Sequence, residues 1–381
     1  MLSRISHLRR TITPLLSASL SYEVVYKSTG HPLDVYELAP QSSDYGSHTL
    51  SPNEVLVKFL AAPINPADIN LAEGKYGISV PLPAVGGNEG VARVEKVGSQ
   101  VKSLRPGHWV IPARNAFGTW RQFAIVSEED DLIQVPNDIP IAYAASLSVN
   151  PCTAYRMLKD FVSLKEGDVV IQNGANSMVG LSVIQLCKSM NVKTINIVRS
   201  DRPDVDNTLR LLTNLGGDVN ITDEQLRSYE FHHDILSEMG PIKLALNCVG
   251  GRVVTDMVRL LPPNTSLVSY GGMSRRPINL PMDLLTSRNI SMKGFWVSKW
   301  YEEHSRLERA IMIAEIASLI RSKQFTLFYE LHDIDDFQYA LRRHLEPFQL
   351  RKVLLNLDYP DRLEEHDSLG EEAYKVFETN V

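Results

Sequence analysis

Hydrophobic positions along the chain follow two different periods, and the change falls near residue 141. Before it, short runs of alternating or β-branched residues are separated by turns rich in glycine and proline. These runs occupy residues 22–26, 54–60, 91–98 and 107–112. Short strands at such intervals predict a small β-barrel or sandwich, with the second strand broken by the prolines within residues 61–66.

After residue 141, apolar positions at helical spacing alternate with short β-branched stretches. The expected strands cover residues 169–171, 194–198, 244–249, 266–270 and 290–296. Helices are expected between several of them and after Trp300. This alternation predicts an α/β fold with a doubly wound parallel sheet. Residues 326–357 return to strand and short-helix patterns and are expected to rejoin the β-rich region.

The turn after the first strand of this sheet is a candidate ligand site. Residues 173–177 read NGANS and lead into a helical pattern. Free N–H groups and the dipole at a helix N-terminus favour a phosphate, so a dinucleotide is expected against Asn176, Ser177, Met178 and Val179. The G-x-G-x-x-G spacing is absent, however, and a turn with few glycines is often only a turn.

The end of the next strand favours NADP(H) over NAD(H). NAD sites usually carry an acidic residue about 20 positions past the turn, whereas this chain has Arg199, Ser200, Asp201 and Arg202 there. Guanidinium groups match a phosphate bidentately, so this stretch is expected to hold the 2′-phosphate of the cofactor. The alternative is a solvated loop, which explains one arginine more easily than two.

Composition narrows the function classes. The 381 residues are 44% hydrophobic and 22% charged, which is typical of a soluble protein with room for two domains. A net charge of −6 argues against nucleic acid as the main partner. Cys152, Cys187 and Cys248 lie in apolar stretches without metal-site spacing. The chain has no run of 18 apolar residues, so no membrane span is predicted.

The two ends of the chain differ in charge from the rest. Residues 1–22 contain three arginines and many serines and threonines but no acidic residue, which predicts a mitochondrial transit peptide. A disordered basic tail is the alternative, and a secretory signal fits less well because no continuous apolar core follows the charges. Residues 358–381 are acidic and poor in apolar residues, and are interpreted as a mobile tail.

Eight motifs carry a resemblance to a known family. They are PINPADIN (63–70), GKYG (74–77), PAVGGNEG (83–90), GTWR (118–121), VNPCTAYR (149–156), LNCVGG (246–251), YGGM (270–273) and GFW (294–296). With them the chain resembles the zinc-free medium-chain dehydrogenases/reductases, and among these the mitochondrial trans-2-enoyl-thioester reductases. Two departures stand out: Met178 replaces a common glycine, and a residue is inserted between Arg199 and Arg202.

The resemblance implies a fold, a reaction and a location. A GroES-like catalytic domain is expected at residues 23–148 and 321–357, and a Rossmann-type NADP-binding domain at residues 149–320. The implied activity is NADPH-dependent reduction of trans-2-enoyl thioesters in the fatty-acid synthesis of the mitochondrial matrix. The enoyl group of the substrate would be carried on coenzyme A or on acyl carrier protein. The implied assembly is a homodimer.

It also assigns residue roles. Three scattered cysteines leave no zinc ligand set, so no metal is expected and the proton must come from a protein group or from solvent. That donor is expected to be Tyr76, because a phenol keeps its proton at neutral pH. Further cofactor contacts are expected from Asn150, Tyr270, Gly271, Gly272, Met273, Phe295, Trp296, Val297 and Lys352.

Each role has a simpler alternative. A lone tyrosine in a turn, such as Tyr76, is more often a packing or surface residue. Asn150 is equally explained as a helix N-cap before Pro151. The aromatic residues would look the same in a core, and Lys352 would look the same on a solvated surface. Arg275-Arg276 and Arg342-Arg343 are candidates for the phosphates of an acyl carrier or for ordinary surface charge.

Two other functions remain open from the sequence. One is a zinc-free quinone or alkenal reductase of the same superfamily, against which the Tyr76 motif and the N-terminal composition argue. The other is a binding protein for nucleotide or RNA that kept the fold without catalysis. The retained Tyr76 and the two arginines make this second alternative less favourable.

Overall fold

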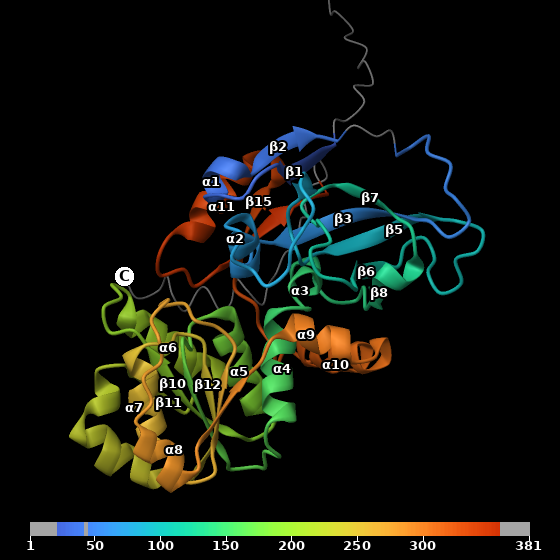
Figure 1. The fold of residues 1–381 in the computed structure, drawn as a ribbon. Coiled ribbons are helices and arrows are strands. Elements are labelled where there is room, and N and C mark those ends of the chain that lie inside the picture. The colour runs from blue at the N-terminus through green and yellow to red at the C-terminus, as the bar shows by residue number, and fades with distance from the viewer. Residues whose placement is uncertain (1–20, 42–44, 359–381) are drawn as a thin grey trace, which may run out of the picture.

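The computed structural model describes residues 21–41 and 45–358, so the expected transit peptide and acidic tail lie almost entirely outside the described residues. The chain forms a β-rich half and a parallel-sheet half, which are stacked in Figure 1 with the β-rich half above. Tyr22 already belongs to the first strand, and its main-chain N–H donates to Gln122 Oε1 at 2.8 Å.

The β-rich half contains two sheets. A seven-stranded sheet has the order β15-β16-β3-β5-β6-β8, with β7 paired to β3, and a three-stranded sheet has the order β2-β1-β4. The strands are β1 (Tyr22–Tyr26), β2 (Glu37–Pro40), β3 (Val55–Pro63), β4 (Ala84–Val85), β5 (Val91–Val97), β6 (Trp109–Pro112), β7 (Phe123–Val126), β8 (Leu132–Val135), β15 (Tyr329–Asp333) and β16 (Lys352–Asn356). The helices are α1 (Pro32–Val35), α2 (Pro66–Ala72), α3 (Ile141–Ala145) and α11 (Phe337–Leu345).

The return of the chain to this half is confirmed, and it corrects one expected strand end. The predicted break at residues 61–66 comes too early, because β3 continues to Pro63. There β16 pairs antiparallel with Ala61, Ala62 and Pro63. This end of β3 is therefore paired with a strand that lies far away in the sequence. The strand and the return segment therefore form one sheet around a shared core.

The other half is a six-stranded sheet whose strands are all parallel, in the order β11-β10-β9-β12-β13-β14. Its strands are β9 (Val169–Asn173), β10 (Lys193–Val198), β11 (Val219–Thr222), β12 (Ile242–Asn247), β13 (Ser266–Ser269) and β14 (Ser291–Gly294). Its helices are α4 (Asn150–Asp160), α5 (Met178–Ser189), α6 (Val205–Leu215), α7 (Arg252–Leu260) and α8 (Met282–Arg288). The sequence-based prediction missed α6, α8 and β11, and it extended three strands beyond their ends at Asn247, Ser269 and Gly294.

Two further helices, α9 (Val297–Glu303) and α10 (Arg306–Arg321), pack beside the β-rich half (Figure 1). Apolar residues of α10 share a core with β6 and β8. Arg309 donates to the carbonyls of Pro112 and Ala113, both at 2.9 Å. The expected domain boundary at residue 320 stays a prediction.

Short 3-10 or π-helical turns complete the fold. They are Glu129–Asp131, Gln225–Arg227, Phe231–Ile235, Leu236–Glu238 and Ile334–Asp336. Across the described ranges, no helix is both long and apolar enough to cross a membrane.

Candidate active site

The turn between β9 and α5 has the local geometry of a phosphate site. Ser177 is the N-cap of the twelve-residue helix α5, and its side chain accepts from the Gly180 N–H at 3.1 Å. The side chain of Asn173, at the end of β9, accepts from the Cys248 N–H at 2.9 Å and so ties this turn to the end of β12. The helix N-terminus is therefore held at the carboxyl edge of the sheet, where ligands of such sheets bind.

A glycine keeps this turn narrow. Gly174 has φ +60°, and a Cβ there would lie 2.4 Å from Cys248 Sγ. Asn176, Ser177 and Met178 are half-buried, and Val179 is buried. A capped helix end with a turn that admits no side chain fits the diphosphate of a dinucleotide, even with Met178 in place of a glycine.

The two arginines after β10 differ in their surroundings. Arg199 is exposed, its guanidinium lies 4.7 Å from the Phe348 ring centre, and its ion pair with Asp201 is solvent-exposed at 3.3 Å. Arg202 is buried and bidentate to Asp204 at 2.7 and 2.9 Å. The expectation of two free guanidiniums is thus altered: Arg199 can meet a phosphate directly, whereas Arg202 already has a carboxylate partner.

Ser200 is oriented by its backbone, because its N–H donates to Asp223 Oδ1 at 2.9 Å. This contact joins the turn after β10 to the residue that follows β11. The stretch from Arg199 to Asp201 therefore has a defined path at the sheet edge.

The segment after β13 closes over the same turn. Burial raises the pKa of the Tyr270 hydroxyl, which faces the Cys248 thiol and the Ser177 hydroxyl. Gly271 and Gly272 are exposed, and the side chain of Met273 is 66% exposed. Tyr270 thus lies inside the site, while the next three residues form its rim.

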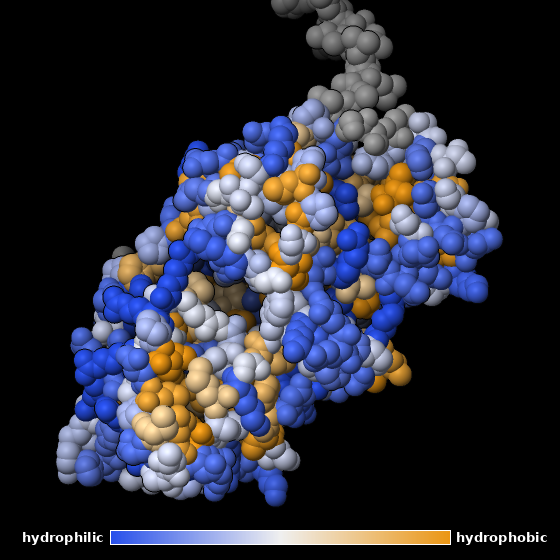
Figure 2. Space-filling model, viewed as in Figure 1, coloured by the Kyte–Doolittle hydropathy of each residue, from blue (hydrophilic) through white to orange (hydrophobic). Residues whose placement is uncertain are grey.

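Tyr76 and Trp296 meet across the two halves of the molecule. Trp296 Nε1 donates to the Tyr76 hydroxyl oxygen at 3.0 Å, and the two rings are perpendicular with centres 5.4 Å apart. Tyr76 follows α2 of the β-rich half, and Trp296 is the residue before α9. Figure 2 shows a hollow between the two halves of the surface.

The neighbours of Trp296 are less open. Val297 is buried, and Phe295 packs edge-on against Phe161 with ring centres 6.0 Å apart. These two residues fit the simpler alternative of core packing at least as well as a direct cofactor contact.

Asn150 lies at the start of α4, where the chain passes from one half to the other. The N-cap alternative is wrong, because α4 begins at Asn150 itself and Val149 is its N-cap residue. The Asn150 Oδ1 atom is buried and has no hydrogen-bond partner among the described residues. A buried carbonyl oxygen without a donor costs about 1–3 kcal/mol, so this atom fits a donor from a ligand.

Lys352 is not on a solvated surface. It is 5% exposed at the start of β16, and its ammonium group donates to Asn65 Oδ1. Burial lowers the pKa of Lys352, and the carboxylates of Glu89 and Asp68 oppose that shift. The side chain is thus held inside a polar cluster by Asn65.

The sequence reading missed the carboxylates of this cluster. Asp68 accepts from the Asn65 N–H at 2.7 Å and from Asn88 Nδ2 at 2.7 Å, yet burial raises the pKa of Asp68 to about 6. Glu89 is also buried, with a pKa raised by burial. The Asn65-x-x-Asp68 spacing of a capping box was the one local signal available, and the structure has that box at α2.

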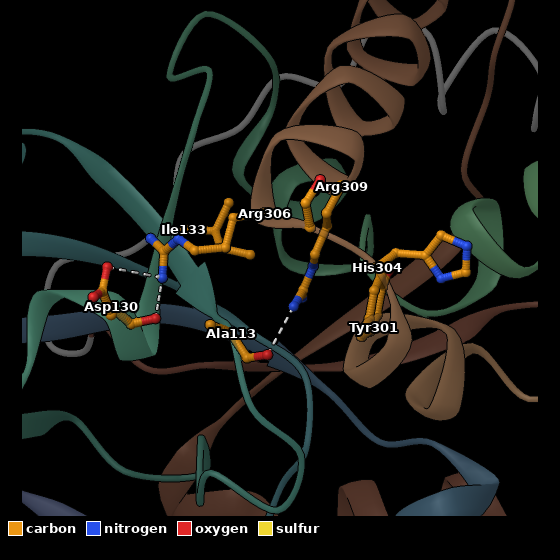
Figure 3. Close-up of a pocket in the computed structure, with 8 residues that line it drawn as sticks. Ala113, Asp130, Ile133, Tyr301, His304, Arg306 and Arg309 are labelled. Carbon is orange, nitrogen blue, oxygen red and sulfur yellow. Dashed lines mark hydrogen bonds and ion pairs between the residues drawn. The ribbon is translucent and has the colours of Figure 1, made fainter.

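A separate pocket of about 240 Å³ lies between α10 and the β-rich half (Figure 3). Arg306 and Arg309 line it, and both donate to main-chain carbonyls of the β-rich half. No residue expected at the cofactor site lines this pocket, and its arginines join the helix to the barrel. Within the described ranges, no group of three or more His, Cys, Asp or Glu side chains is placed to hold a metal ion.

Comparisons with known proteins cover most of the chain. Residues 51–137 match the alcohol dehydrogenase GroES-like domain, and residues 179–314 match the zinc-binding dehydrogenase family. The mitochondrial enoyl-[acyl-carrier-protein] reductase of Xenopus tropicalis is 45% identical over 87% of this chain and 94% of its own length. The protein of that name from Homo sapiens is 45% identical over 88% of each.

The chain belongs to the mitochondrial enoyl-[acyl-carrier-protein] reductase family. The resemblance drawn from the motifs is therefore confirmed, as is the fold class of a GroES-like domain beside a parallel sheet.

Solved structures of this family share the fold closely. A mitochondrial 2-enoyl thioester reductase Etr1p/Etr2p heterodimer from Candida tropicalis has a TM-score of 0.80 at 35% identity, covering 88% of this chain and 99% of that one. An Etr1p complex with NADP and crotonyl-CoA has the same TM-score, identity and coverage. A Bacillus thuringiensis structure described as a putative NADPH:quinone reductase is less similar, with 25% identity and a TM-score of 0.76.

Proposed function

We infer that this protein is an NADPH-dependent reductase that converts trans-2-enoyl thioesters to saturated acyl thioesters. The observation that carries the inference is the Tyr76–Trp296 hydrogen bond across the two halves, in a chain whose relatives are enoyl reductases over nearly their whole length. The Etr1p complex with NADP and crotonyl-CoA supports the same cofactor and thioester class. The names of the relatives support a mitochondrial location, for which we propose the matrix.

The cofactor fits residues from several strand ends. We propose that the turn before α5 holds the diphosphate, that Arg199 meets the 2′-phosphate, and that Asn150 Oδ1 accepts a hydrogen bond from the cofactor. When bound, NADPH supplies the hydride that the substrate receives at C3. The buried Oδ1 of Asn150, which has no hydrogen-bond partner within residues 21–41 and 45–358, and the exposed guanidinium of Arg199 are the observations that fit this group.

Tyr76 is the proposed proton donor. Trp296 Nε1 can only donate, so it uses the acceptor side of the Tyr76 hydroxyl and leaves the hydroxyl proton free for transfer. As charge moves toward the thioester oxygen, Tyr76 delivers that proton to C2, directly or through water. Trp296 then stabilises the phenolate oxygen by the same hydrogen bond.

The thioester carrier is proposed as acyl carrier protein or coenzyme A, which share the phosphopantetheine arm. Arg275 and Arg276 are exposed near the rim of the site. Arg275 also pairs with Glu73 of the other half at 3.3 Å, and Glu73 lies three residues before Tyr76. Arg343 is bound to Glu330 at 2.9 Å, so it is less suited to an external phosphate.

NADPH oxidation tests the function. With a medium-chain trans-2-enoyl-CoA the absorbance of NADPH is expected to fall rapidly, whereas a quinone should give little or no oxidation. Oxidation with the quinone alone would keep the cofactor and discard the thioester. No oxidation with either acceptor, despite NADPH binding, would favour the non-catalytic alternative.

We also propose a homodimer formed through β14. In the part of the chain that the structure describes, β14 pairs on one side only, with β13, and is the edge of the six-stranded sheet. Met292 on β14 is 48% exposed and Met282 on α8 is 68% exposed. Apolar side chains gather over α8 in Figure 2, and an open edge strand beside an apolar patch is a surface that a second copy can cover.

A further inference from the structure

Glu89 is a carboxylate of the β-rich half that contacts the first turn of α4. It is 1% exposed, and its Oε1 accepts from the Val149 N–H at 2.7 Å and from Ser148 Oγ at 3.2 Å. Val149, the N-cap residue of α4, has no side chain that caps the helix. Glu89 therefore caps α4 from the other half of the molecule, where the positive end of the helix dipole favours its negative charge.

The orientation of this carboxylate comes from a directional chain of hydrogen bonds. Lys352 Nζ donates to Asn65 Oδ1, and Asn65 Nδ2 donates to Glu89 Oε2 at 2.9 Å. An ammonium group only donates and a carboxylate only accepts, so the Asn65 amide can join them in one orientation alone. The chain runs without a break from β16, through the N-cap of α2, to the start of α4.

A second contact holds the same crossing segment. Tyr301 of α9 donates its hydroxyl to the Ser148 carbonyl at 2.5 Å, and the Arg309 guanidinium lies 3.7 Å from the centre of the Tyr301 ring. Ser148 is thus hydrogen-bonded to Glu89 through its hydroxyl and to Tyr301 through its carbonyl. The next residue is Asn150, whose buried Oδ1 atom has no partner among the described residues.

We propose that Glu89, oriented by Asn65 and Lys352, is a positioning residue that sets Asn150 against the cofactor. Buried charged groups are often replaceable by apolar residues without loss of stability, so a stabilising role alone does not account for the charged side chains of Glu89 and Lys352. Instead, Glu89 Oε1 accepts hydrogen bonds from the Ser148 hydroxyl and the Val149 N–H, which immediately precede Asn150 in the chain. The proposal rests on the proposed function, in which Asn150 contacts NADPH.

A double-mutant cycle on NADPH affinity tests the coupling. Asn150→Ala and Glu89→Gln are each expected to raise the Kd for NADPH about tenfold, the effect of one lost hydrogen bond. Glu89→Gln keeps the shape but replaces one acceptor by a donor that faces Asn65 Nδ2. Because both changes disturb one contact, the double variant should bind NADPH within about twofold of Asn150→Ala alone.

Other outcomes overturn the proposal. A double variant about 100-fold weaker than the parent would mean that the two residues act independently. An unchanged Kd in Glu89→Gln would remove Glu89 from cofactor positioning. An unchanged Kd in Asn150→Ala would leave Glu89 nothing to position, while enoyl-CoA reduction by the same variant would show that the proposed function stands.

Two further variants separate positioning from stability. Thr119→Val removes a neighbouring buried hydrogen bond, from Thr119 Oγ1 to the Glu89 carbonyl at 2.7 Å. This bond is not part of the hydrogen-bond chain that runs from Lys352 to Glu89. It should lower Tm without changing the Kd for NADPH, and a weakened affinity would mean that any local destabilisation suffices. If Glu89→Gln does not fold, Ser148→Ala replaces it in the cycle, with an expected two- to threefold loss that vanishes beside Asn150→Ala.

Discussion

Tyr76 and Trp296 are separated by 220 positions in the chain and form one hydrogen bond in the fold. Each residue was expected at the site from its own motif, but no pattern in the sequence pairs them. The pairing matters chemically, because a donor-only indole beside a phenol leaves the phenol proton free and stabilises the oxygen once the proton is gone. At the scale of single residues, function here depends on which partner each side chain has.

The first prediction concerns Tyr76. Tyr76→Phe keeps the ring but removes the transferable proton, so kcat with an enoyl-CoA should fall about 100-fold or more. The Kd for NADPH should stay nearly unchanged. Stopped-flow turnover and fluorescence titration measure the two quantities, and Tyr229→Phe, on a side chain 74% exposed, is the control. Full turnover by Tyr76→Phe would remove Tyr76 from the mechanism.

The second prediction separates the two arginines. Arg199→Ala should reduce the preference for NADPH over NADH about tenfold or more, because a charge-assisted hydrogen bond to the 2′-phosphate contributes about 1.5–3 kcal/mol. Arg202→Ala should mainly lower Tm, because it leaves Asp204 without its buried partner. The ratio of kcat/KM for the two cofactors measures the preference. An Arg199→Ala enzyme with unchanged preference would assign the 2′-phosphate to other groups.

At the scale of elements, the phosphate turn depends on a helix end and on the close approach of another strand. The sequence has no G-x-G-x-x-G spacing, yet the turn has the narrow conformation that the glycines of that motif allow. Gly174 supplies the positive φ, and Cys248 of the neighbouring strand end leaves no room for a side chain. Only pairing of β9 with β12 brings that thiol beside the turn.

The third prediction compares two glycines with positive φ. Gly174→Ala and Gly107→Ala should each lose about 1 kcal/mol of stability from backbone strain, since the two φ angles are +60° and +89°. Only Gly174→Ala adds a collision, with Cys248 Sγ, whereas a Cβ at Gly107 meets nothing within 4 Å. NADPH affinity should therefore fall in Gly174→Ala alone. Equal affinities in the two variants would place the diphosphate elsewhere.

At the scale of the whole molecule, two connections between the halves lie close to Tyr76. One is its own hydrogen bond to Trp296, and the other is the ion pair of Glu73 with Arg275. Glu89 adds a buried connection at the start of α4. The relative position of the two halves, and with it the hollow between them, is thus set by contacts that cross from one half to the other.

The fourth prediction concerns assembly. Met292→Lys puts a charge on the exposed edge strand β14 and should convert the proposed dimer to a monomer. Light scattering after size-exclusion chromatography measures the mass. Leu307→Lys, on a side chain of α10 that is 69% exposed, is the control and should stay dimeric. If the parent protein is a monomer, or if both variants remain dimers, the interface does not use this edge.

The sequence alone determined the fold class and the family, and it predicted the turn before α5 and the candidate site residues, because hydrophobic period, turn chemistry and short motifs are local properties. It also located the return of the chain to the β-rich half. It missed α6, α8 and β11, as well as β2, β4, β7 and β8 of the β-rich half, and it ended β3 before Pro63, because short elements and strand limits depend on partners elsewhere in the chain.

Only the tertiary structure decided how the site residues are used. Arg199 and Arg202 are equivalent in the sequence, but the structure gives them different surroundings, because only Arg202 is buried, beside Asp204. Lys352 and Glu89 gain meaning only when β16, α2 and α4 meet, because a charged group without water must find partners wherever the fold provides them. Local sequence patterns therefore indicate which residues are candidates for the site, whereas long-range packing determines which residues they contact.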